Sequence, residues 1–261
     1  MLKKERQREI RKVIDDTGKV EGEILSKRLG VSDMTIRRDL GELDQRGLVE
    51  RVHGGALLAR NSRDVEAPVI ERTKENTEIK QHIGRRVAGM IQDGEKIFLG
   101  SGSTTSAVAE AILNHRNITV ITNALNIAYT MISAPEINVA MTGGFLRRSE
   151  LSLIGHFAEH ALEGVQVDKV IIGMRGIDPV KGLTSDNMDE LMTDQAILNI
   201  SKNIIVVAEH GKFGHVAAIR TAPITAATTI VTDQGGPKDV LAAIRNMGVR
   251  IIEVGQGPAE R

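Results

Sequence analysis

Residues 31–40, VSDMTIRRDL, predict the beginning of a short amphipathic helix that carries two adjacent arginines. Ser32 is suited to cap this helix, because its hydroxyl can accept a hydrogen bond from one of the unpaired N–H groups in the first turn. The apolar residues that follow at i, i+4 and i+7 place one stripe of side chains against a core: Ile36, Leu40 and Leu43. Because Gly47 ends the pattern, we expect a helix over 33–46.

Two short helices precede this segment and a hairpin follows it. Helical spacing of apolar residues predicts a first helix over 3–16 and a second over 21–29. The side chains expected to be buried are Ile10, Val13 and Ile14 in the first helix and Ile24, Leu25 and Leu29 in the second. Residues 48–58, LVERVHGGALL, alternate around a Gly-Gly pair, which is typical of a small β-hairpin. Together these elements predict a winged helix-turn-helix domain over residues 1–58.

The two arginines occupy different positions around the third helix. At about 100° per residue, Arg38 points away from the apolar stripe and Arg37 lies on its flank, whereas Asp39 lies close to the stripe and is expected to pack or tether. The second helix of a helix-turn-helix enters the major groove of DNA, with its first residues nearest to the base edges. A guanidinium suits this position because it donates two parallel hydrogen bonds to guanine or to phosphate. We therefore predict contacts to DNA from Ser32, Met34, Thr35, Arg37 and Arg38, and from Arg51 and His53 of the hairpin.

An alternative is that these arginines form an ordinary solvated face. Arg38 could pair with Glu42 one turn further along, a contact that contributes little on its own. The helix-helix-hairpin context favours the DNA-binding interpretation, and so does a small excess of basic residues near the N-terminus. Residues 1–60 hold 14 Lys and Arg against 11 Asp and Glu, whereas the remainder holds 20 against 23.

The overall composition is that of a globular protein with two domains. Of its 261 residues, 41% are hydrophobic and 26% are charged. The longest apolar runs have the length of strands, and no apolar segment follows the basic N-terminus, so we expect a cytoplasmic protein without a membrane span or secretory signal. The absence of cysteine excludes disulfides, thiolate metal sites and a cysteine nucleophile. An aromatic content of 2% argues against a stacking platform for single strands or RNA.

Beyond the hairpin the sequence pattern changes. Residues 59–72 are polar and lack periodicity, which predicts a linker, and a longer helix is expected over 73–92. Short apolar runs then alternate with helical patterns; the runs are KIFLG, ITVIT, INVAMT, DKVIIG, NIIVVAE and TTIVTD. Such alternation is typical of a largely parallel sheet covered on both faces, in which ligands bind beyond the C-terminal ends of the strands. Residues 73–261 are therefore predicted to form an α/β domain with a ligand site at that edge.

The residues after the first of these runs favour the binding of an anion. In LGSGSTTSAVAEAI (99–112) a strand ends, turns through small residues and opens a helix, so that backbone N–H groups and hydroxyls meet at a helix N-terminus. The candidate phosphate cradle is Ser101, Gly102, Ser103, Thr104 and Thr105. Thr105 stands where a dinucleotide fingerprint would have its third glycine, so a dinucleotide is not expected. The alternative for such a loop, taken on its own, is that its small residues only form a turn and bind nothing.

Further loops are expected at the same edge of the sheet. Thr122 and Asn123 follow the second run and offer a hydroxyl and an amide. Gly143, Gly144 and Arg147 follow the third run and offer close backbone approach and a cation. Later loops add charged residues at the mouth of the site, namely Arg175, Asp178, Asp186 and Lys212, each of which is equally well explained as a solvated loop residue.

Residues 156–160, HFAEH, match a pattern found in some zinc proteases. Two histidines four residues apart on a helix supply only two ligands, whereas catalytic zinc needs a third that is placed by the fold. We therefore interpret this segment as a surface helix, and we expect neither a metal nor a cofactor.

The segment LSKRLGVSDMTIRRDLGELDQRGLVERVHGGA, residues 25–56, resembles the signature helix-turn-helix of the DeoR/GlpR family of bacterial sugar-metabolism regulators. The order VS, TIRRDL and the closing RVHGGA carry this resemblance, which extends over nearly the whole chain. It implies a C-terminal sensor domain similar in fold to ribose-5-phosphate isomerase, in which the first three loops form a sugar-phosphate site. It also implies a repressor whose affinity for double-stranded operator DNA is controlled by a phosphorylated sugar. Because one head makes few contacts, we expect a homodimer or homotetramer on paired half-sites.

Two positions depart from the family pattern. The first loop begins with Gly100, where the family usually has aspartate, and no lysine stands near Asp189, where the family typically has one. The first difference bears on one sugar-hydroxyl contact and on the choice of effector. An isomerase or amino-sugar-phosphate deaminase fused to a DNA-binding head is the alternative function. Its proton shuttling needs a positioned carboxylate base, and because Asp178 and Asp186 lie in no recognisable catalytic motif, we predict a protein that is not an enzyme.

Overall fold

The computed structural model describes residues 3–45, 48–52, 54–58 and 66–255. His53, predicted as a phosphate contact, therefore lies outside the described residues. The chain separates into two compact units, Met1–Glu66 and Ala67–Arg261, and each is described by itself. The predicted fold class is confirmed, because the first unit is a winged helix and the second is built on a parallel sheet.

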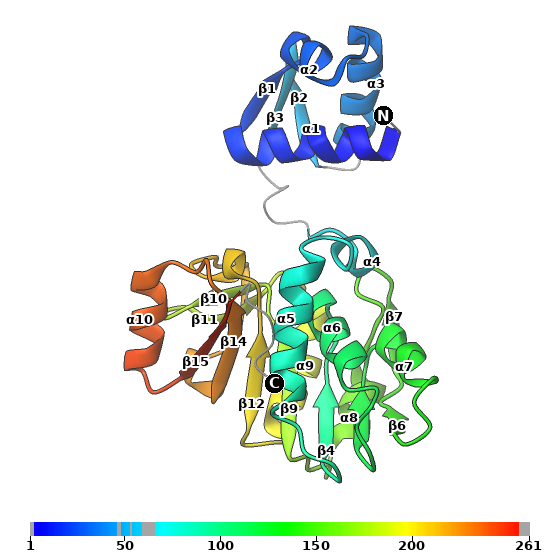
Figure 1. Cartoon of the computed structure of the whole chain (residues 1–261), viewed down its shortest axis with the longest axis vertical. Helices are drawn as coiled ribbons and strands as arrows, with labels where there is room; N and C mark the ends of the chain where they lie inside the picture. The colour runs from blue at the N-terminus through cyan, green and yellow to red at the C-terminus, as the bar shows by residue number, and fades with distance from the viewer. Residues whose placement is uncertain (1–2, 46–47, 53, 59–65, 256–261) are drawn as a thin grey trace. The chain divides into compact units, whose positions relative to one another are not determined.

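The N-terminal unit packs three helices on a small sheet (Figure 1). The helices are α1 (Lys3–Thr17), α2 (Gly22–Leu29) and α3 (Asp33–Gln45), and the strands are β1 (Lys19–Glu21), β2 (Val49–Val52) and β3 (Gly55–Leu58). The strands pair antiparallel in the order β1–β3–β2. The buried apolar core is Ile10, Ile14, Val20, Leu25, Ile36, Leu40, Leu43, Val49 and Ala56. The stripe predicted on α3 belongs to this core, so the opposite face of α3 is turned outward.

Strand β1 is the element of this unit that the sequence did not predict. Three residues are too few to show a strand periodicity, and the helical pattern of α2 begins directly after them. The approach of β3 to β1 explains one glycine of the Gly-Gly pair, because a Cβ on Gly55 would lie 2.0 Å from the carbonyl oxygen of Val20. Gly54 has φ +86°, a left-handed conformation that glycine adopts without strain. The wing is therefore part of a three-stranded sheet and not a lone hairpin.

The buried face of α2 also differs from the prediction. Leu25 is fully buried, whereas Ile24 is 56% exposed. Adjacent side chains on a helix point about 100° apart, so this short helix directs only one of the two into the core. Leu29 packs against the core while remaining partly exposed. The expectation that Ile24 is buried is therefore wrong.

The C-terminal unit contains a sheet of seven parallel strands. The strands are β4 (Lys96–Leu99), β5 (Thr119–Thr122), β6 (Asn138–Met141), β9 (Lys169–Gly173), β12 (Ile204–Val207), β14 (Thr229–Asp233) and β15 (Arg250–Val254), in the order β15–β14–β12–β9–β4–β5–β6. The first six coincide with the apolar runs noted in the sequence. Strand β15 was not predicted, because its sequence RIIEV mixes charged and apolar residues near the end of the chain.

Helices cover both faces of this sheet. One face packs against α5 (Thr77–Ala88), α6 (Ser103–Ala111) and α7 (Leu125–Met131), and the other against α8 (His156–Leu162), α9 (Leu191–Asn199) and α10 (Lys238–Asn246). Helices α5 and α6 approach closely, since a Cβ on Gly84 would lie 2.5 Å from the carbonyl oxygen of Ala107. None of the described helices is both long and apolar enough to cross a membrane.

Short antiparallel elements lie around this sheet and were not predicted. Strands β7 (Phe145–Arg147) and β8 (Ser152–Ile154) form a ribbon, and β10 (Gly176–Asp178), β11 (Gly182–Ser185) and β13 (Ile219–Ala222) form a second small sheet. The described residues also form the short 3₁₀ helices η1 (Met188–Glu190), η2 (His210–Lys212) and η3 (Ile224–Ala226). Each is three or four residues long, which is too short for a periodic sequence signal.

The end of the predicted linker is ordered against the C-terminal unit. Within the range 59–72 the structure forms helix α4 (Val69–Arg72), and the N–H of Val69 donates to the carbonyl of Ser149 (2.7 Å). The helix expected over 73–92 is also shorter than predicted. It begins only at Thr77, because Asn76 has φ +47° and interrupts the helical backbone.

Candidate functional site

The outward face of α3 carries the predicted DNA contacts. Met34 is 72% exposed, the side chain of Arg38 is 82% exposed, and Arg37 is exposed as well. The hydroxyl of Ser32 accepts from the N–H of Thr35 (3.3 Å), which is the N-cap contact expected from the sequence. The two hydroxyls also lie 2.9 Å apart. The long side chains of this face thus extend into solvent, while the two short ones fix the first turn.

The alternative interpretation of Arg38, an ion pair with Glu42, finds weak support. Nε of Arg38 lies 4.0 Å from Oε1 of Glu42. The same carboxylate is bound more closely by Lys3 of α1 (2.6 Å) and accepts from Gln7 (2.9 Å), and these two hydrogen bonds lower the pKa of Glu42. Glu42 therefore joins α1 to α3, and the guanidinium of Arg38 remains extended into solvent.

Asp39 fastens the same helix from its buried side. The residue is 1% exposed, and its carboxylate accepts from Nε of Arg6 and from the amide of Gln7 (3.3 Å). The hydrogen bond from Arg6 to Asp39 raises the pKa of the arginine further above its ordinary value. Removing one partner of such a pair would leave a buried charge uncompensated. The tethering role predicted for Asp39 is confirmed.

The wing places a second arginine beside α3. The N–H of Arg51 donates to Oδ1 of Asp44 (3.2 Å), which joins β2 to the end of the helix. The guanidinium Nη1 of Arg51 lies 3.7 Å from the point that a Cβ on Gly41 would occupy. The guanidinium of Arg51 therefore lies against α3 at Gly41, at a distance that would still be an ordinary contact for a Cβ, and Arg38 and Arg51 belong to one basic surface.

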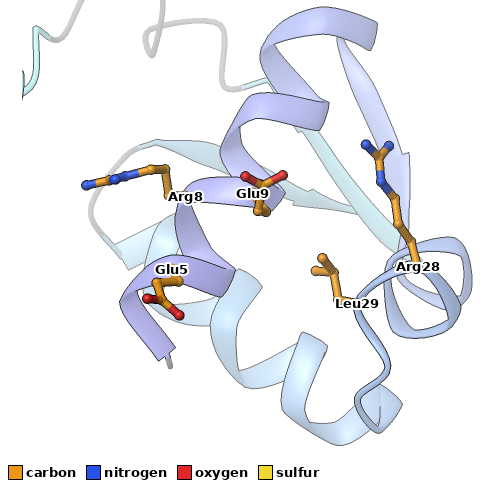
Figure 2. A pocket seen from close by; sticks show the side chains of 5 residues that line it. All are labelled: Glu5, Arg8, Glu9, Arg28 and Leu29. Carbon is orange, nitrogen blue, oxygen red and sulfur yellow. The ribbon is translucent and has the colours of Figure 1, made fainter. Parts of the chain in front are cut away.

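A shallow hollow on α1 and α2 is a further surface feature of this unit (Figure 2). Its lining residues are Glu5, Arg8, Glu9, Arg28 and Leu29. Two carboxylates balance two guanidiniums, so the hollow carries no excess of positive charge that would attract phosphates. None of the predicted DNA contacts lines it, and we assign it no part in DNA binding.

In the C-terminal unit, the predicted effector loops meet at one edge of the parallel sheet. Strands β6, β5, β4, β9 and β12 are neighbours, so the loops that follow them emerge side by side. A Cβ on Gly173, at the end of β9, would lie 3.9 Å from the carbonyl oxygen of Ser101, which follows β4. The structure thus brings together the loops that the sequence assigned to one site.

The loop after β4 opens helix α6, as expected. Gly102 has φ +138°, and its carbonyl oxygen accepts from the hydroxyls of Thr105 (2.9 Å) and Ser106 (2.7 Å). The hydroxyl of Thr105 is therefore used within the turn. Within the described residues, the hydroxyls of Ser103 and Thr104 make no hydrogen bond, although both residues are buried. These two hydroxyls and the first N–H groups of α6 are the groups available to hold an anion.

Asn123 in the loop after β5 and Asn126 in the first turn of α7 have amide oxygens without a partner among the described residues. Thr122 is wholly buried and its hydroxyl donates to a carbonyl of β4 (2.6 Å), so this residue links two strands. The amide nitrogen of Asn123 donates to a carbonyl of β8 (3.3 Å), and that of Asn126 donates to a hydroxyl on α6 (2.7 Å). The amide oxygens of both residues are buried without a partner among the described residues. Hydroxyl groups of a polyol would satisfy such acceptors.

The loop after β6 leads into the ribbon of β7 and β8. Gly143 and Gly144 have φ +71° and +124°, and a Cβ on Gly144 would lie 2.7 Å from a backbone oxygen of β8. Nη1 of Arg147 donates to Oε2 of Glu190 (2.6 Å), whose other oxygen accepts from the hydroxyl of Ser152 (2.9 Å). The predicted cation therefore belongs to a network whose other members, Glu190 and Ser152, were not predicted.

Asp194, on α9, lies beside this network. Burial raises the pKa of Asp194 to about 8, the carboxylate of Glu190 acts in the same direction, and Arg147 opposes both. The residue nevertheless keeps part of its surface exposed. At neutral pH its carboxyl is largely protonated, so it can donate a hydrogen bond as well as accept one. Only the fold reveals these acids, because Glu190 is separated from Arg147 by 43 positions.

Replacing Asp194 with asparagine is expected to change how stability depends on pH. A carboxyl whose pKa is raised on folding stabilises the folded state below its ordinary pKa of 3.8, and this contribution is lost as the pH rises toward about 8. The Asp194→Asn variant should therefore gain stability relative to the wild type as the pH rises through that interval. Urea unfolding of both proteins in acidic and mildly alkaline buffer measures the difference. An identical difference in the free energy of unfolding under both conditions would contradict the raised pKa.

The later charged residues are only partly brought together. Arg175 lies between β9 and β10, and Asp186 directly follows β11. Nε of Arg175 donates to Asp186 (2.7 Å) at the open end of the β10–β11 pair. Asp178 lies at the opposite end, where its carboxylate accepts from two backbone N–H groups of the turn (2.8 and 2.7 Å). Lys212 is partly exposed in η2, after β12. Asp178 thus closes a turn, while Arg175 and Lys212 lie in loops that follow strands of the parallel sheet.

The HFAEH segment forms α8. The rings of His156 and His160 stack with centroids 6.0 Å apart, and His160 pairs with Glu163 (3.0 Å). Glu159 accepts from the hydroxyl of Thr193 (3.1 Å). Across the described ranges, no group of three His, Cys, Asp or Glu is arranged to hold a metal ion.

These two units together define a class of protein. A winged helix with arginines on its outer helix is joined, in one chain, to a parallel α/β sheet with polar loops at its C-terminal edge, which is the organisation of a DNA-binding regulator with a sensor domain. The DeoR-like helix-turn-helix domain matches residues 6–62, and the DeoR C terminal sensor domain matches residues 75–234. The chain belongs to the DeoR family of transcriptional regulators.

The chain is similar along its length to several named regulators. It is 33% identical over 251 residues to the glycerol-3-phosphate regulon repressor of Escherichia coli K12, covering 96% of this chain and 99% of that protein. It is 32% identical over 253 residues to the HTH-type transcriptional regulator GlpR of Haloferax volcanii, covering 97% and 98%. It is 30% identical over 240 residues to the HTH-type transcriptional repressor CsqR of Escherichia coli K12, covering 92% and 91%. The family assignment made from the helix-turn-helix signature is confirmed.

Among solved structures, the chain resembles ribose 5-phosphate isomerase A from Methanocaldococcus jannaschii. The identity is 14% and the TM-score 0.40, over 53% of this chain and 55% of that chain. A likeness of this size bears on neither catalysis nor individual residues.

Proposed function

We propose that the protein represses a carbohydrate-catabolism operon and that a phosphorylated sugar, bound at the C-terminal edge of the parallel sheet, lowers its affinity for operator DNA. The N-terminal unit supplies the DNA contacts: Ser32, Met34, Thr35, Arg37 and Arg38 of α3 and Arg51 of the wing. In a bacterial cell, binding to chromosomal DNA places the protein in the cytoplasm. Two half-sites on the operator require two heads, hence a homodimer or homotetramer.

The exposure of Arg38 on a fixed helix is the observation that carries the DNA-binding proposal. Its side chain is 82% exposed although an acid stands one turn away, and that acid is held by another helix. Asp39 holds the opposite side of α3 against α1. An arginine presented in this way can donate a bidentate pair to a guanine edge in the major groove.

Polar groups at the sheet edge that make no side-chain hydrogen bond within the described residues support a phosphorylated sugar as the effector. The hydroxyls of Ser103 and Thr104 stand at the start of α6, where N–H groups favour an anion. The buried amide oxygens of Asn123 and Asn126 favour hydroxyl donors. A ligand that combines a phosphate with several hydroxyls fits both the anion-binding groups at the start of α6 and the two amide oxygens. Gly143, Gly144 and Arg147 complete the proposed contacts.

Helix α4 offers a route from this edge to the DNA-binding head. It directly follows the segment that leaves the N-terminal unit, and Arg72 pairs with Glu150 in the turn between β7 and β8. Both side chains are largely buried, at 14% and 8% exposure. Movement of the β7–β8 ribbon on effector binding would therefore displace α4.

The beginning of α5 is fastened to the same edge. Lys80 is 3% exposed and its ammonium lies 3.2 Å from Glu209, in the loop after β12. The side-chain amide of Asn76 donates to the same carboxylate (2.5 Å). We infer that the segment 67–80 couples the two functions by changing the spacing of the two DNA heads. By linkage, operator DNA must then weaken effector binding by the same factor.

The alternative, a sugar-phosphate isomerase or deaminase, is less well supported by the carboxylates. Asp178 closes a turn, Asp186 is paired with Arg175, and Glu190 is held by Arg147. A base that shuttles a proton must be ionised and directed at the substrate carbon. We propose that the protein is not an enzyme. Turnover of any member of a sugar-phosphate panel during incubation with the purified protein would overturn this choice.

The variant Thr104→Val tests the effector site. Valine keeps the shape of the side chain but removes a hydroxyl that makes no hydrogen bond within the described residues, so the fold should be unaffected. Loss of one hydrogen bond to a charged phosphate should weaken effector binding by roughly 10- to 150-fold and leave DNA binding intact. Thermal shift with a panel of sugar phosphates, followed by DNA release, measures both effects.

The matched control for this variant is Thr119→Val, a threonine at the opposite end of the neighbouring strand β5. It should bind the effector like the wild type. If Thr104→Val remains fully inducible at the same effector concentration, the anion is held elsewhere.

A further inference from the structure

The parallel sheet ends at β6, an edge strand with an unusual surface. Within the described residues β6 pairs on one side only, with β5, and all four of its residues are exposed. Val139 is 40% and Met141 41% exposed. Proteins usually protect such an edge with charged residues or proline, and the sequence NVAM of β6 has neither.

Helix α7 is the neighbouring helix at this side of the sheet (Figure 1). The apolar surface continues from β6 onto this helix. An open hollow lies between the two elements, lined almost entirely by apolar side chains. Tyr129 is 78% and Ile132 77% exposed at its rim. Exposed apolar side chains gathered on one surface in this way are typical of a contact with another macromolecule.

The charge distribution identifies the partner. Residues 117–146, which include β6 and α7, contain a single charged residue, Glu136, whereas 26% of 30 residues would be about eight. A twofold contact places charges near the axis next to their own copies, so a surface almost free of charge suits association with itself. A different protein would be selected by complementary charges, which this surface does not offer.

We propose that β6 pairs antiparallel with β6 of a second copy of this chain, with the α7 side chains packing around the junction. Two seven-stranded sheets would then continue into one, and the β6 edge of each copy would be paired, with the β15 edges remaining at the two outer ends. The proposal rests on the proposed function in one respect, because an operator with two half-sites needs two heads. It specifies the surface that joins them.

The first test measures the mass of the full chain in solution. The double variant Ile132→Lys with Val139→Lys adds charges at exposed positions, so folding should be preserved, as thermal unfolding will show. Sedimentation velocity should give half the mass of the wild type. The control is Val180→Lys, an apolar residue that is 81% exposed in the turn between β10 and β11, and its mass should be unchanged. A double variant with the wild-type mass, or a monomeric wild type, would overturn the proposal.

The second test uses the absence of natural cysteine. In an antiparallel pair, residues opposite one another have Cα atoms about 4.5–5.5 Å apart, within the reach of a disulfide. Val139→Cys and Ala140→Cys place a single thiol near the twofold axis, and at least one should form a covalent dimer on mild oxidation. Val180→Cys should not. Failure of both β6 variants to cross-link would exclude this strand pairing.

Failure of the interface and failure of the proposed function give different results. Binding of a sugar phosphate and of random DNA requires only one chain, so both should survive in the Ile132→Lys, Val139→Lys protein. Operator affinity should fall, because the two heads are no longer joined. A wild type that dimerises through β6 but binds neither DNA nor sugar phosphate would refute the function and leave the interface standing.

Discussion

Replacing Arg38 with alanine is expected to weaken binding to the operator by roughly 5- to 150-fold, with a much smaller effect on random DNA. The reason is the position of this side chain, which is 82% exposed on the outward face of α3 and only distantly paired. A base-reading arginine loses its hydrogen bonds only on the correct sequence. Fluorescence anisotropy at one fixed salt concentration measures both affinities, with an operator selected from a pool of random duplexes.

The wing arginine supplies the contrast for this experiment. Arg51→Ala should weaken binding to both DNAs and reduce the slope of affinity against salt by about one, as expected for the loss of one phosphate contact. Equal losses on operator and random DNA for Arg38→Ala would assign that residue to phosphate contact and not to base reading.

Removing the ion pair between α4 and the β7–β8 turn is expected to abolish induction while leaving both binding sites functional and the backbone hydrogen bond from Val69 to Ser149 in place. The paired change Arg72→Gln with Glu150→Gln removes the ion pair without leaving a lone buried charge. Coupling between two sites typically amounts to about 5- to 150-fold in affinity, and in this variant the factor should approach one. Titrating the effector against the preformed protein–operator complex measures that factor.

An equally buried ion pair elsewhere in the sheet provides the matched control. Lys169 and Glu95 pair at the N-terminal ends of β9 and β4, with side chains 12% and 18% exposed. Lys169→Gln with Glu95→Gln should cause a comparable loss of stability and keep the coupling. If both double variants remain inducible, the signal does not pass through α4.

The fold was predictable where the pattern was long enough to be periodic. Six of the seven strands of the parallel sheet coincide with apolar runs, and the stripe of Ile36, Leu40 and Leu43 is buried as predicted. Elements of three or four residues, such as β1 and α4, carry no periodicity and exist because neighbouring elements supply their hydrogen bonds. For the same reason the sequence gives no sign of helix α4 within the predicted linker.

The sequence predicted where the candidate site lies, but it did not predict all of the residues that meet there. The rule that ligands bind beyond the ends of parallel strands brings the loops after β4, β5 and β6 to one edge. The rule does not say which side chains already form hydrogen bonds within the protein. The hydroxyls of Thr122 and Thr105 do so, and they are therefore not available to a ligand. Nor does the rule locate Glu190, which meets Arg147 only through tertiary packing.

The buried contact between Asp39 and α1 has a consequence for how DNA preference can change. Arg6 and Gln7 hold the rotation of α3 about its own axis before any DNA is present. If Met34 and Arg38 read bases, as we propose, substitutions at these two positions are expected to alter sequence preference while the orientation of α3 is kept. Substitutions at Arg6 or Gln7 are expected to loosen α3 against α1 and to weaken binding to every sequence, because the buried carboxylate of Asp39 loses a partner. One acid thus separates the residues that would set sequence preference from those that hold the helix in place.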